Sequence, residues 1–500
     1  MPRTIDRMGK GLKGLAGRFS QIPTRLQRHA ANNLGVIMND QVTGYKKVRL
    51  DSLDLLDKYY DKTQYDGLPD WDQSIDSNEY IAVRKRKPRI NYNVAKVIVD
   101  KVGGKITGAA TFPLFKIEDS PDDTEFFRMV QKLSGFRRNM VEPIRKTLLS
   151  GACYVRYELV EGDVIMEWAH SKHCYPTFDA SEELTQIEVR YVYEDPNDKD
   201  ARGKFKKKWY RRMSTKTAEI LYDNPEYREG SIPTFVEVSR NDHNLGWVQG
   251  EWLRTSKKKF SPDGESIVEP ILDFIDDMNY SLSQTSQAVG YNQDPQLAMR
   301  NMSEDELGEL IRSSQRAWNL GREGEANFIE ADMKGVTTAG ESRQEFRNLM
   351  LEVVRVVLHD PEKMVGSAQS AKALELLNAP LVELIDDLRT SLEESMKKLL
   401  LKMGLTILMV TEQGFETALT FPQGYRPKSL DLSITWPPIY PLTIEDIQKK
   451  VMAAVQATTA KFLSRESATR WVAADFGIQD IDEEIAKIAA EPILNPFGTF

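Results

Sequence analysis

The sequence predicts an α+β fold that is mainly helical, and three observations support this class. Apolar residues recur at spacings of three and four over several long stretches, which is the pattern of helices that bury one face. Residues 151–260 instead carry short runs of β-branched and aromatic residues between turns, which is typical of antiparallel strands. The 500 residues are 41% hydrophobic and 28% charged. Such a chain can bury a large core, and we expect about three or more domains or subregions.

Composition excludes several classes of protein. The 67 Lys and Arg residues against 75 Asp and Glu give a net charge of −8, which argues against a protein that coats nucleic acid but leaves local DNA contacts open. The two cysteines cannot form a disulfide framework, which indicates a reducing compartment. The longest apolar run, near 399–410, is short and contains Lys402. We therefore expect no membrane-spanning helix, and the basic N-terminus lacks the apolar stretch of a signal peptide.

No motif of nucleotide, nucleophile or metal chemistry is complete. The nearest phosphate-loop string, residues 103–107, lacks the leading glycine and the Ser or Thr after its lysine. His170, His173 and Cys174 stand close together, but a fourth zinc ligand is missing nearby, so a polar cluster at a strand edge is the better interpretation. We predict no catalytic residue, no metal and no cofactor. A hydrolase with unmarked acidic residues stays open.

The N-terminal segment, residues 1–45, is polar and basic. Residues 1–28 contain seven Lys or Arg residues and one acid, Asp6, which gives 7 − 1 = +6. We interpret the segment as a flexible basic arm that docks on a neighbour or on nucleic acid. A disordered solubility tail is the equal alternative.

The next region alternates helices with strands. The expected elements are a short helix within 46–75, a helix from about 94 to 102, a strand at 113–117, helices over 123–150 and an antiparallel meander over 151–260. Asn91 or Asn93 can cap the second helix. The basic run 202–212 alternates with aromatic residues. We interpret that run as a solvated strand face rather than a DNA contact.

A long helix is predicted over 266–290. Ser266 and Glu269 match a capping box, and Pro270 falls in the first turn, where a missing N–H costs least. The apolar stripe of this helix comprises Val268, Ile271, Leu272, Ile275, Met278 and Leu282. Asp273, Asp276, Asp277 and Asn279 form the opposite, acidic face.

A second long helix follows residues 337–342 and stops at His359-Asp360-Pro361, because the residue before a proline avoids the helical region. Its core stripe comprises Phe346, Leu349, Met350, Val353, Val356 and Val357. Between the two helices we expect a small α/β insert. After the second helix comes a short loop, 361–368, rich in small residues and carrying one cation, Lys363.

The last elements are dominated by one very long helical pattern. We expect helix from about 370 to 410, a strand at 430–436 and three closing helices at about 443–459, 465–475 and 479–491. Pro380 lies inside the long pattern and must kink or split it.

This order of elements resembles the tailed-bacteriophage portal, or head-to-tail connector, proteins over residues of about 46–491. Residues 91–108, NYNVAKVIVDKVGGKITG, are similar to the family's early Asn-rich helix and glycine turn. The pattern Leu432-x-Ile434-x-Trp436-Pro437, followed by Thr443-x-Glu445-x-x-x-Lys449, is similar to its closing strand and first crown helix. No string is diagnostic alone, so the order over most of the chain supports the resemblance.

The resemblance implies a portal fold with wing, stem, clip and crown, assembled as a ring of twelve subunits around a central channel. It assigns 1–45 to a flexible basic arm, 46–262 to the wing, 263–293 to a stem helix, 294–334 to the clip, 335–359 to a second stem helix, 360–369 to the tunnel loop, 370–441 to the kinked helix and closing strand of the wing, and 442–500 to the crown.

The resemblance also implies sites and partners. The tunnel loop would meet DNA in the channel through Glu362, Lys363, Met364, Val365, Gly366 and Ser367. The clip would dock the packaging motor and tail adaptors through Glu304, Glu306, Glu309, Arg312 and Arg316, a mixture of charges that suits an exchangeable interface. The expected partners are further copies of the chain, double-stranded DNA, the terminase motor, tail adaptors, capsid protein and scaffolding protein, without a membrane. The expected location is the portal vertex of the virion, after assembly in the host cytoplasm.

Two alternatives remain at this point. One is another phage head or head–tail adaptor protein, against which the long kinked helix after a short loop argues. The other is a metal-dependent nuclease, which the missing motifs make the weaker alternative.

Overall fold

The computed structural model describes residues 44–72, 81–118, 120–160, 162–229, 233–258, 261–293, 296–300, 325–329, 333–357, 371–412, 425–440, 444–473, 476 and 481–490. Most of the predicted basic arm, residues 1–43, lies outside the described residues. Helices and strands both form the body of the molecule, which confirms the predicted α+β class. Among the described helices, none has the length and apolarity needed to cross a membrane.

The first half of the chain follows the predicted alternation. Its helical elements are α3 (Gly44–Asp61), η2 (Val83–Lys85), α4 (Val94–Thr107), α5 (Pro121–Ser134), α6 (Phe136–Ser150) and η3 (Ser171–His173). Its strands are β1 (Leu114–Ile117), β2 (Ala152–Val160), β3 (Asp163–His170), β4 (Cys174–Phe178), β5 (Leu184–Lys199), β6 (Phe205–Thr215), β7 (Ala218–Tyr222), β8 (Glu237–Asp242) and β9 (Gly250–Arg254).

The second half is mostly helical. Its helical elements are η4 (Glu269–Ile271), α7 (Leu272–Gln293), α9 (Met333–Val353), α11 (Ala371–Leu377), α12 (Ala379–Glu412), α13 (Ile444–Thr459), α14 (Arg465–Ala473) and α15 (Ile481–Ala490). Its strands are β10 (Gln296–Arg300), β11 (Glu325–Ile329) and β12 (Leu432–Thr435).

The strands between α6 and η4 form two antiparallel sheets, as the meander pattern predicted. One sheet has the order β3-β2-β9 and the other β4-β5-β6-β7-β8. The long hairpin β5–β6 pairs from Gln186 opposite Thr215 to Lys199 opposite Phe205. A third, two-stranded sheet pairs β1 with β12, so that Phe115 lies opposite Ile434. This pairing joins segments that are more than 300 residues apart in the sequence.

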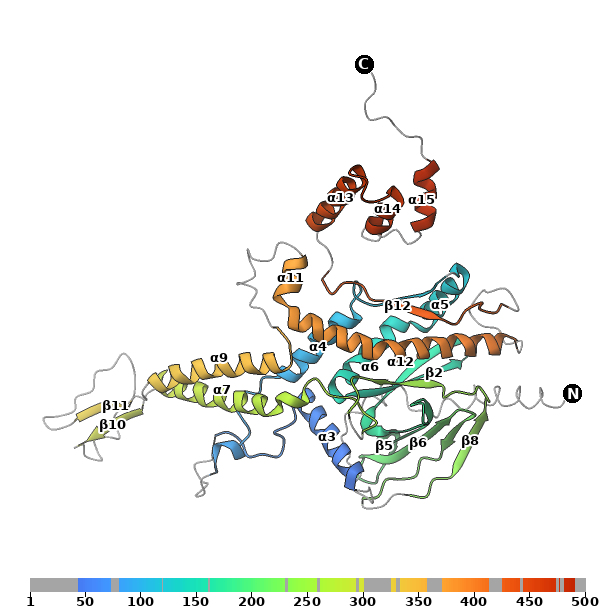
Figure 1. Ribbon diagram of the computed structural model, residues 1–500. Helices are drawn as coiled ribbons and strands as arrows, with labels where there is room; N and C mark the ends of the chain where they lie inside the picture. Colours follow the sequence, from blue (N-terminus) through green and yellow to red (C-terminus); the bar gives the residue numbers. More distant parts are fainter. Residues whose placement is uncertain are drawn as a thin grey trace.

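The main core lies where α4, α5, α6 and α12 pack around the β2–β3–β9 sheet (Figure 1). Apolar residues of α12, including Leu392, Met396 and Leu399, are fully buried there, as the helical stripe predicted. Gly404 lies where α12 crosses α5, and a Cβ at this position would come within 2.7 Å of the ring of Phe127. This glycine therefore allows the close approach of the two helices.

The predicted start signals are present. The side chain of Asn93 accepts a hydrogen bond from the amide of Lys96 and caps α4. Ser266 Oγ accepts from the amides of Val268 and Glu269 at 3.1 and 3.2 Å. The long helix then begins one 3-10 turn later than the pattern indicated, at Leu272.

Two helix boundaries refine the prediction. The long pattern divides at Asn378, between α11 and α12, and Pro380 lies in the first turn of α12, where its missing N–H has no helical acceptor. The second long helix was predicted to run to residue 359. In the structure α9 ends at Val353, and Arg355 follows with a positive φ of 55°. The left-handed residue terminates the helix before the His-Asp-Pro sequence is reached.

A buried ion network joins the two large sheets. Arg156 of β2 donates from Nε to Glu219 of β7 at 2.9 Å and from Nη1 to Glu167 at 2.9 Å, and it also binds Glu158. Arg212 of β6 binds Glu219 at 2.7 Å. Burial alone would raise the pKa of Glu219, but the two arginines lower it well below its usual range. The carboxylate is therefore ionised and is shared by two buried guanidiniums, whose charge Glu158 and Glu167 also balance.

Asp123 fastens the segment before β12 to α5. Its buried carboxylate accepts hydrogen bonds from the hydroxyl of Tyr425 and from the amides of Lys428 and Ser429. Burial raises the pKa of Asp123, but the hydrogen bonds to the ionised form outweigh it and the pKa lies below its ordinary value. The carboxylate thus stabilises the folded state when it is charged.

We expect Asp123→Asn to lower the free energy of unfolding at neutral pH and to change it little in acid. The folded-state pKa is lowered, so the stabilisation is present above the unfolded pKa of roughly 4 and is lost as the pH falls through the folded value. The loss at pH 7 should be about 1–3 kcal/mol, since three donors lose a charged acceptor. Urea denaturation of both proteins at pH 7 and at about pH 2, well below the unfolded pKa, measures it. A difference that stays constant or grows in acid would contradict this role.

Candidate functional site: the paired helices and their anchors

The paired helices α7 and α9 extend away from the body of the molecule. They lie side by side, and β10 and β11 lie beyond their far end (Figure 1). The two strands pair antiparallel, with Gln296 opposite Ile329 and Arg300 opposite Glu325. Two long helices with a strand pair between them are therefore present, while the helix predicted within the insert lies outside the described residues.

The near end of α7 is bound by the segment 59–92. The carboxylate of Asp276 accepts hydrogen bonds from the hydroxyls of Tyr59 and Tyr65 at 2.7 and 2.6 Å. Burial and the bond to Asp276 raise the pKa of both tyrosines, so both stay protonated donors. Asn279 is fully buried, accepts from the amide of Tyr92 at 2.9 Å and donates to Tyr65 at 3.2 Å.

Further contacts of the same kind follow along the helix. Ser283 accepts from the amide of Ile90 at 2.9 Å, and Trp71 donates to Gln287 at 3.1 Å. The hydroxyl of Tyr280 lies within hydrogen-bond distance of the carbonyls of Arg84 and Arg86. We call these contacts between residues 59–92 and the α7 residues Asp276, Asn279, Tyr280, Ser283 and Gln287 the polar clasp.

The polar clasp shows what covers the acidic face that was predicted opposite the apolar stripe. Asp276 and Asn279 point into the molecule, where Tyr59, Tyr65 and Tyr92 contact them. Sequence reasoning missed the clasp because its two halves lie about 200 residues apart and no motif links them. The one available signal was an asparagine among the aspartates, since an amide both donates and accepts and suits a buried position.

We expect Asn279→Leu to lower the free energy of unfolding by about 1–3 kcal/mol, because the amide of Tyr92 loses its acceptor in a buried place. Limited proteolysis should also cut more rapidly within 62–92. The control is Asp277→Asn, which removes an exposed ion pair with Arg84 and should cost less than about 1 kcal/mol. Equal losses for the two variants would show that the clasp does not fix α7.

The predicted core stripe of α9 is only half buried. Met350 and Val356 are buried, as predicted. Phe346, Leu349 and Val353 are not, since their exposed fractions are 41%, 43% and 49%. We call these three residues the α9 row. The correction has a physical cause: one helix partner, α7, covers only one face of α9, so the remaining apolar face has no cover within the described part of the chain.

The residues predicted to bind partners lie outside the described residues. This applies to the docking residues Glu304, Glu306, Glu309, Arg312 and Arg316, and to the loop residues Glu362, Lys363, Met364, Val365, Gly366 and Ser367. The described structure ends on both sides of each segment, at Arg300 and Glu325 and at Val357 and Ala371.

The histidine cluster is structural, as predicted. His170 Nε2 lies 2.9 Å from Asp57 of α3, and Lys172 binds the other oxygen of the same carboxylate at 2.5 Å. Burial lowers the pKa of both His170 and His173 and raises that of the Cys174 thiol. Among the described residues, no set of three His, Cys, Asp or Glu side chains could hold a metal ion. The cluster instead fixes α3 to η3 and the end of β3.

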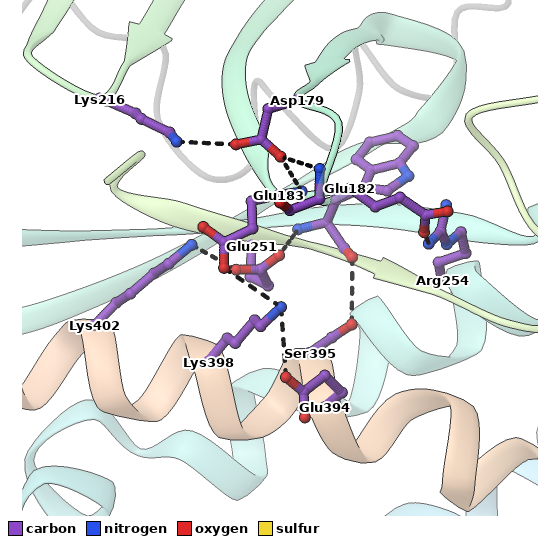
Figure 2. Close-up of polar contacts among 12 residues, drawn as sticks. Asp179, Glu182, Glu183, Lys216, Glu251, Arg254, Glu394, Ser395, Lys398 and Lys402 are labelled. Carbon is purple, nitrogen blue, oxygen red and sulfur yellow. Dashed lines mark hydrogen bonds and ion pairs between the residues drawn. The ribbon is translucent and has the colours of Figure 1, made fainter. Parts of the chain in front are cut away.

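A polar seam fastens α12 to the sheet beside the core (Figure 2). Lys402 binds Glu251 of β9 at 2.6 Å, and Lys398 lies 3.8 Å from Glu183, next to β5. Lys402 also lies 3.4 Å from the carbonyl of Gly250. Since α12 starts beside the paired helices and ends over the sheets, the seam fixes the helix that links these two parts (Figure 1).

Comparisons with known proteins give one match to a family. The family model described as "Phage portal protein, SPP1 Gp6-like" matches residues 40–492. No curated protein matches the chain. Among solved structures, a chain of the "Virion of native gene transfer agent (GTA) particle" is 10% identical, with 76% of this chain and 89% of that chain covered and a TM-score of 0.40. A chain of the "Neck of native GTA particle computed with C12 symmetry" is 11% identical, with 75% and 89% covered and a TM-score of 0.37.

Proposed function

We propose how this chain works from the premise that it belongs to the SPP1 Gp6-like family of phage portal proteins, whose model spans residues 40–492. As a portal protein it is a component of the virion. Twelve copies would form a ring around a channel through which the genome enters and leaves the head. The proposal concerns which surfaces build the ring and which meet DNA, motor and tail.

The α9 row is the observation that carries the ring proposal. Three apolar side chains, Phe346, Leu349 and Val353, recur on one face of a helix that projects from the body, and each is more than 40% exposed in the single chain. An apolar face of this kind on a projecting helix is a protein interface rather than ordinary surface. In a ring, the stem of the neighbouring copy would cover it.

The C-terminal helices need neighbours for the same reason. In the described parts of α13, α14 and α15, only Ala454 and Ala473 are buried. Several large apolar residues are exposed, among them Met452, Val455 and Trp471 in the helices and Phe462 between α13 and α14. The three helices lie apart from the wing (Figure 1). A helical unit of this size with so small a core is not stable alone, so contact with adjacent copies in a crown would supply the missing burial.

The parts of the fold suggest a division of roles. The wing would comprise residues 46–262 with the closing segment 370–441, and the stem the helices of 263–293 and 335–359. The clip, 294–334, would dock the terminase motor and then the tail adaptors through the mixed charges of Glu304, Glu306, Glu309, Arg312 and Arg316. The position of β10 and β11 supports this role for the clip, because the two strands lie beyond the end of the stem (Figure 1). The crown, 442–500, would face the inside of the head, and the N-terminal arm would reach a neighbouring copy or nucleic acid.

Electrostatics suit a channel in which DNA slides. Twelve copies at −8 each give −96 per ring, so a duplex is repelled at most heights and is not trapped. The loop 360–369 would place Lys363 on each subunit near the duplex. A ring of sparse cations guides phosphates without holding them.

We expect Lys363→Glu to leave the ring intact and to impair genome packaging or retention. Each subunit would then oppose the phosphates with a negative charge, and the effect should grow at low salt, where repulsion is less screened. DNA yield and genome length in particles carrying the variant, measured over a range of ionic strengths, test the loop. Normal packaging at every salt concentration would remove the loop from the mechanism.

Two other functions are separable by simple measurements. A head–tail adaptor would also form rings, but without broad wings around the channel, which negative-stain images distinguish. We propose no catalytic role. An assay of nuclease and ATPase activity with Mg²⁺ and Mn²⁺ on the purified chain tests this directly, since a metal-dependent nuclease would cleave DNA under those conditions.

A further inference from the structure

Two lysines of α4 contact the residues that follow α9 and β12. Lys101 Nζ donates to the main-chain carbonyl of Val357, which follows the end of α9. One turn later, Lys105 Nζ lies 3.5 Å from the carbonyl of Ile439 and 4.2 Å from the centre of the Tyr440 ring. A single turn of α4 therefore contacts the end of the stem helix and the segment that leads to the C-terminal helices.

The two ammonium groups repel one another, and neither has an acidic partner within the described part of the chain. No ion pair joins Lys101 or Lys105 to an Asp or Glu of the described residues, although α4 is surrounded by structure and both side chains are half-buried. Burial lowers the pKa of both lysines, and the charge of Lys105 lowers that of Lys101 further. Like charges four residues apart on a helix destabilise each other. Each lysine therefore weakens the contact that the other makes with its main-chain carbonyl.

We propose that Lys101 and Lys105 form a pair of coupled anchors, in which binding of Val357 and binding of Ile439–Tyr440 oppose one another. When Lys105 contacts Tyr440 closely, its charge is fixed near Lys101 and the bond to Val357 is weaker. When the segment 439–440 moves away, Lys105 is free to turn toward solvent and Lys101 binds more firmly. Coupling of this kind is reciprocal. Loss of the contact between Lys101 and Val357 should therefore strengthen the contact between Lys105 and Tyr440.

The segments that the two lysines contact are each also held by α12. Arg355 binds Asp387 of α12 at 2.9 Å, and the guanidinium of Arg389 lies 4.9 Å from the centre of the Trp436 ring. Loss of either lysine therefore loosens one end without releasing it from α12. This allows single lysine variants to stay folded, and circular dichroism checks that they do.

Hydrogen exchange on the purified full-length chain tests the coupling. The first readout is the peptide that contains the hydrogen-bonded amides of Arg355 and Val356, which bond to the carbonyls of Glu352 and Leu351. The second readout is the peptide that contains β12, which pairs with β1. These peptides report on the Lys101 anchor and the Lys105 anchor respectively.

In each methionine variant, the exchange rate should change in opposite directions at residues 355–356 and in β12. Lys105→Met should speed exchange in β12 and slow it at residues 355–356 by roughly twofold, because the repulsion on Lys101 is gone. Lys101→Met should speed exchange at 355–356 on the order of tenfold, since a charged hydrogen bond is lost, and slow it in β12. Lys105→Arg retains the charge and should leave residues 355–356 as in the wild type. Lys96→Met, on the same helix but at neither anchor, should change neither peptide.

Two outcomes would overturn the proposal. One is faster exchange at both ends in Lys105→Met, which would mean that the variant simply weakens α4. The other is an unchanged remote end in both methionine variants. Neither outcome bears on the ring or on DNA, because the exchange experiment needs no assembly. Failure of this inference and failure of the proposed function are therefore distinguishable.

Discussion

Val353→Asp is expected to abolish the ring and to spare the fold of the single chain. Val353 is 49% exposed in one subunit, so an aspartate there costs little before assembly. In the ring the same position would bury an unpaired charge at every interface. That penalty of at least about 2–4 kcal/mol per interface should shift the assembly to single chains. Sedimentation velocity measures the change, and the melting temperature and circular dichroism of the single chain should be those of the wild type.

The matched control is Val238→Asp in β8. Val238 is 53% exposed, so the same substitution is made at nearly the same exposure but outside the α9 row. Rings should persist in this variant. If Val353→Asp also formed rings of normal size, the α9 row would not lie between subunits, and the stem would have to associate through another face.

Glu219→Leu is expected to cause a large loss of stability, because its carboxylate joins the two large sheets. The carboxylate of Glu219 accepts from Arg156 and Arg212, and all three side chains are buried. Its removal takes an acceptor from both buried guanidiniums. Arg156 keeps Glu158 and Glu167, whereas Arg212 keeps Glu158 at the longer distance of 3.7 Å. Breaking a buried ion pair in this way costs about 3–5 kcal/mol. Urea denaturation followed by tryptophan fluorescence should show the midpoint move by a corresponding amount.

The control for this prediction is Glu167→Gln. Glu167 binds the same arginine at the same distance of 2.9 Å, but its side chain is 27% exposed against 9% for Glu219. Solvent screens such a contact, so we expect the free energy of unfolding to fall by about 1 kcal/mol or less. Similar losses in the two variants would mean that burial does not set the strength of the network.

Local signals in the sequence predicted the elements well. Asn93 caps α4 and Ser266 begins the turn before α7, because capping depends on residues within one turn of each other. The antiparallel meander followed from alternation within single strands. The division of the long helix near Pro380 followed from the missing N–H of one residue. Each of these predictions rests on interactions between residues that are close in the sequence.

The contacts between distant segments could not be predicted from the sequence. Asp276 and Asn279 have the pattern of a solvated face, and only the tertiary structure shows that Tyr65 and Tyr92 cover them. The stripe of α9 showed the right period, but periodicity cannot tell which apolar residues face the same chain and which face a neighbour. Val353 is the example, since its spacing fits a core and its exposure fits an interface.

Single-particle electron microscopy of the purified chain shows whether the subunits close into a ring through the α9 row. We expect closed rings with a central channel and broad wings, in which the α9 row of each subunit is covered by the next one. Single chains at the concentrations used for assembly, or rings in which Phe346, Leu349 and Val353 face solvent, would contradict it.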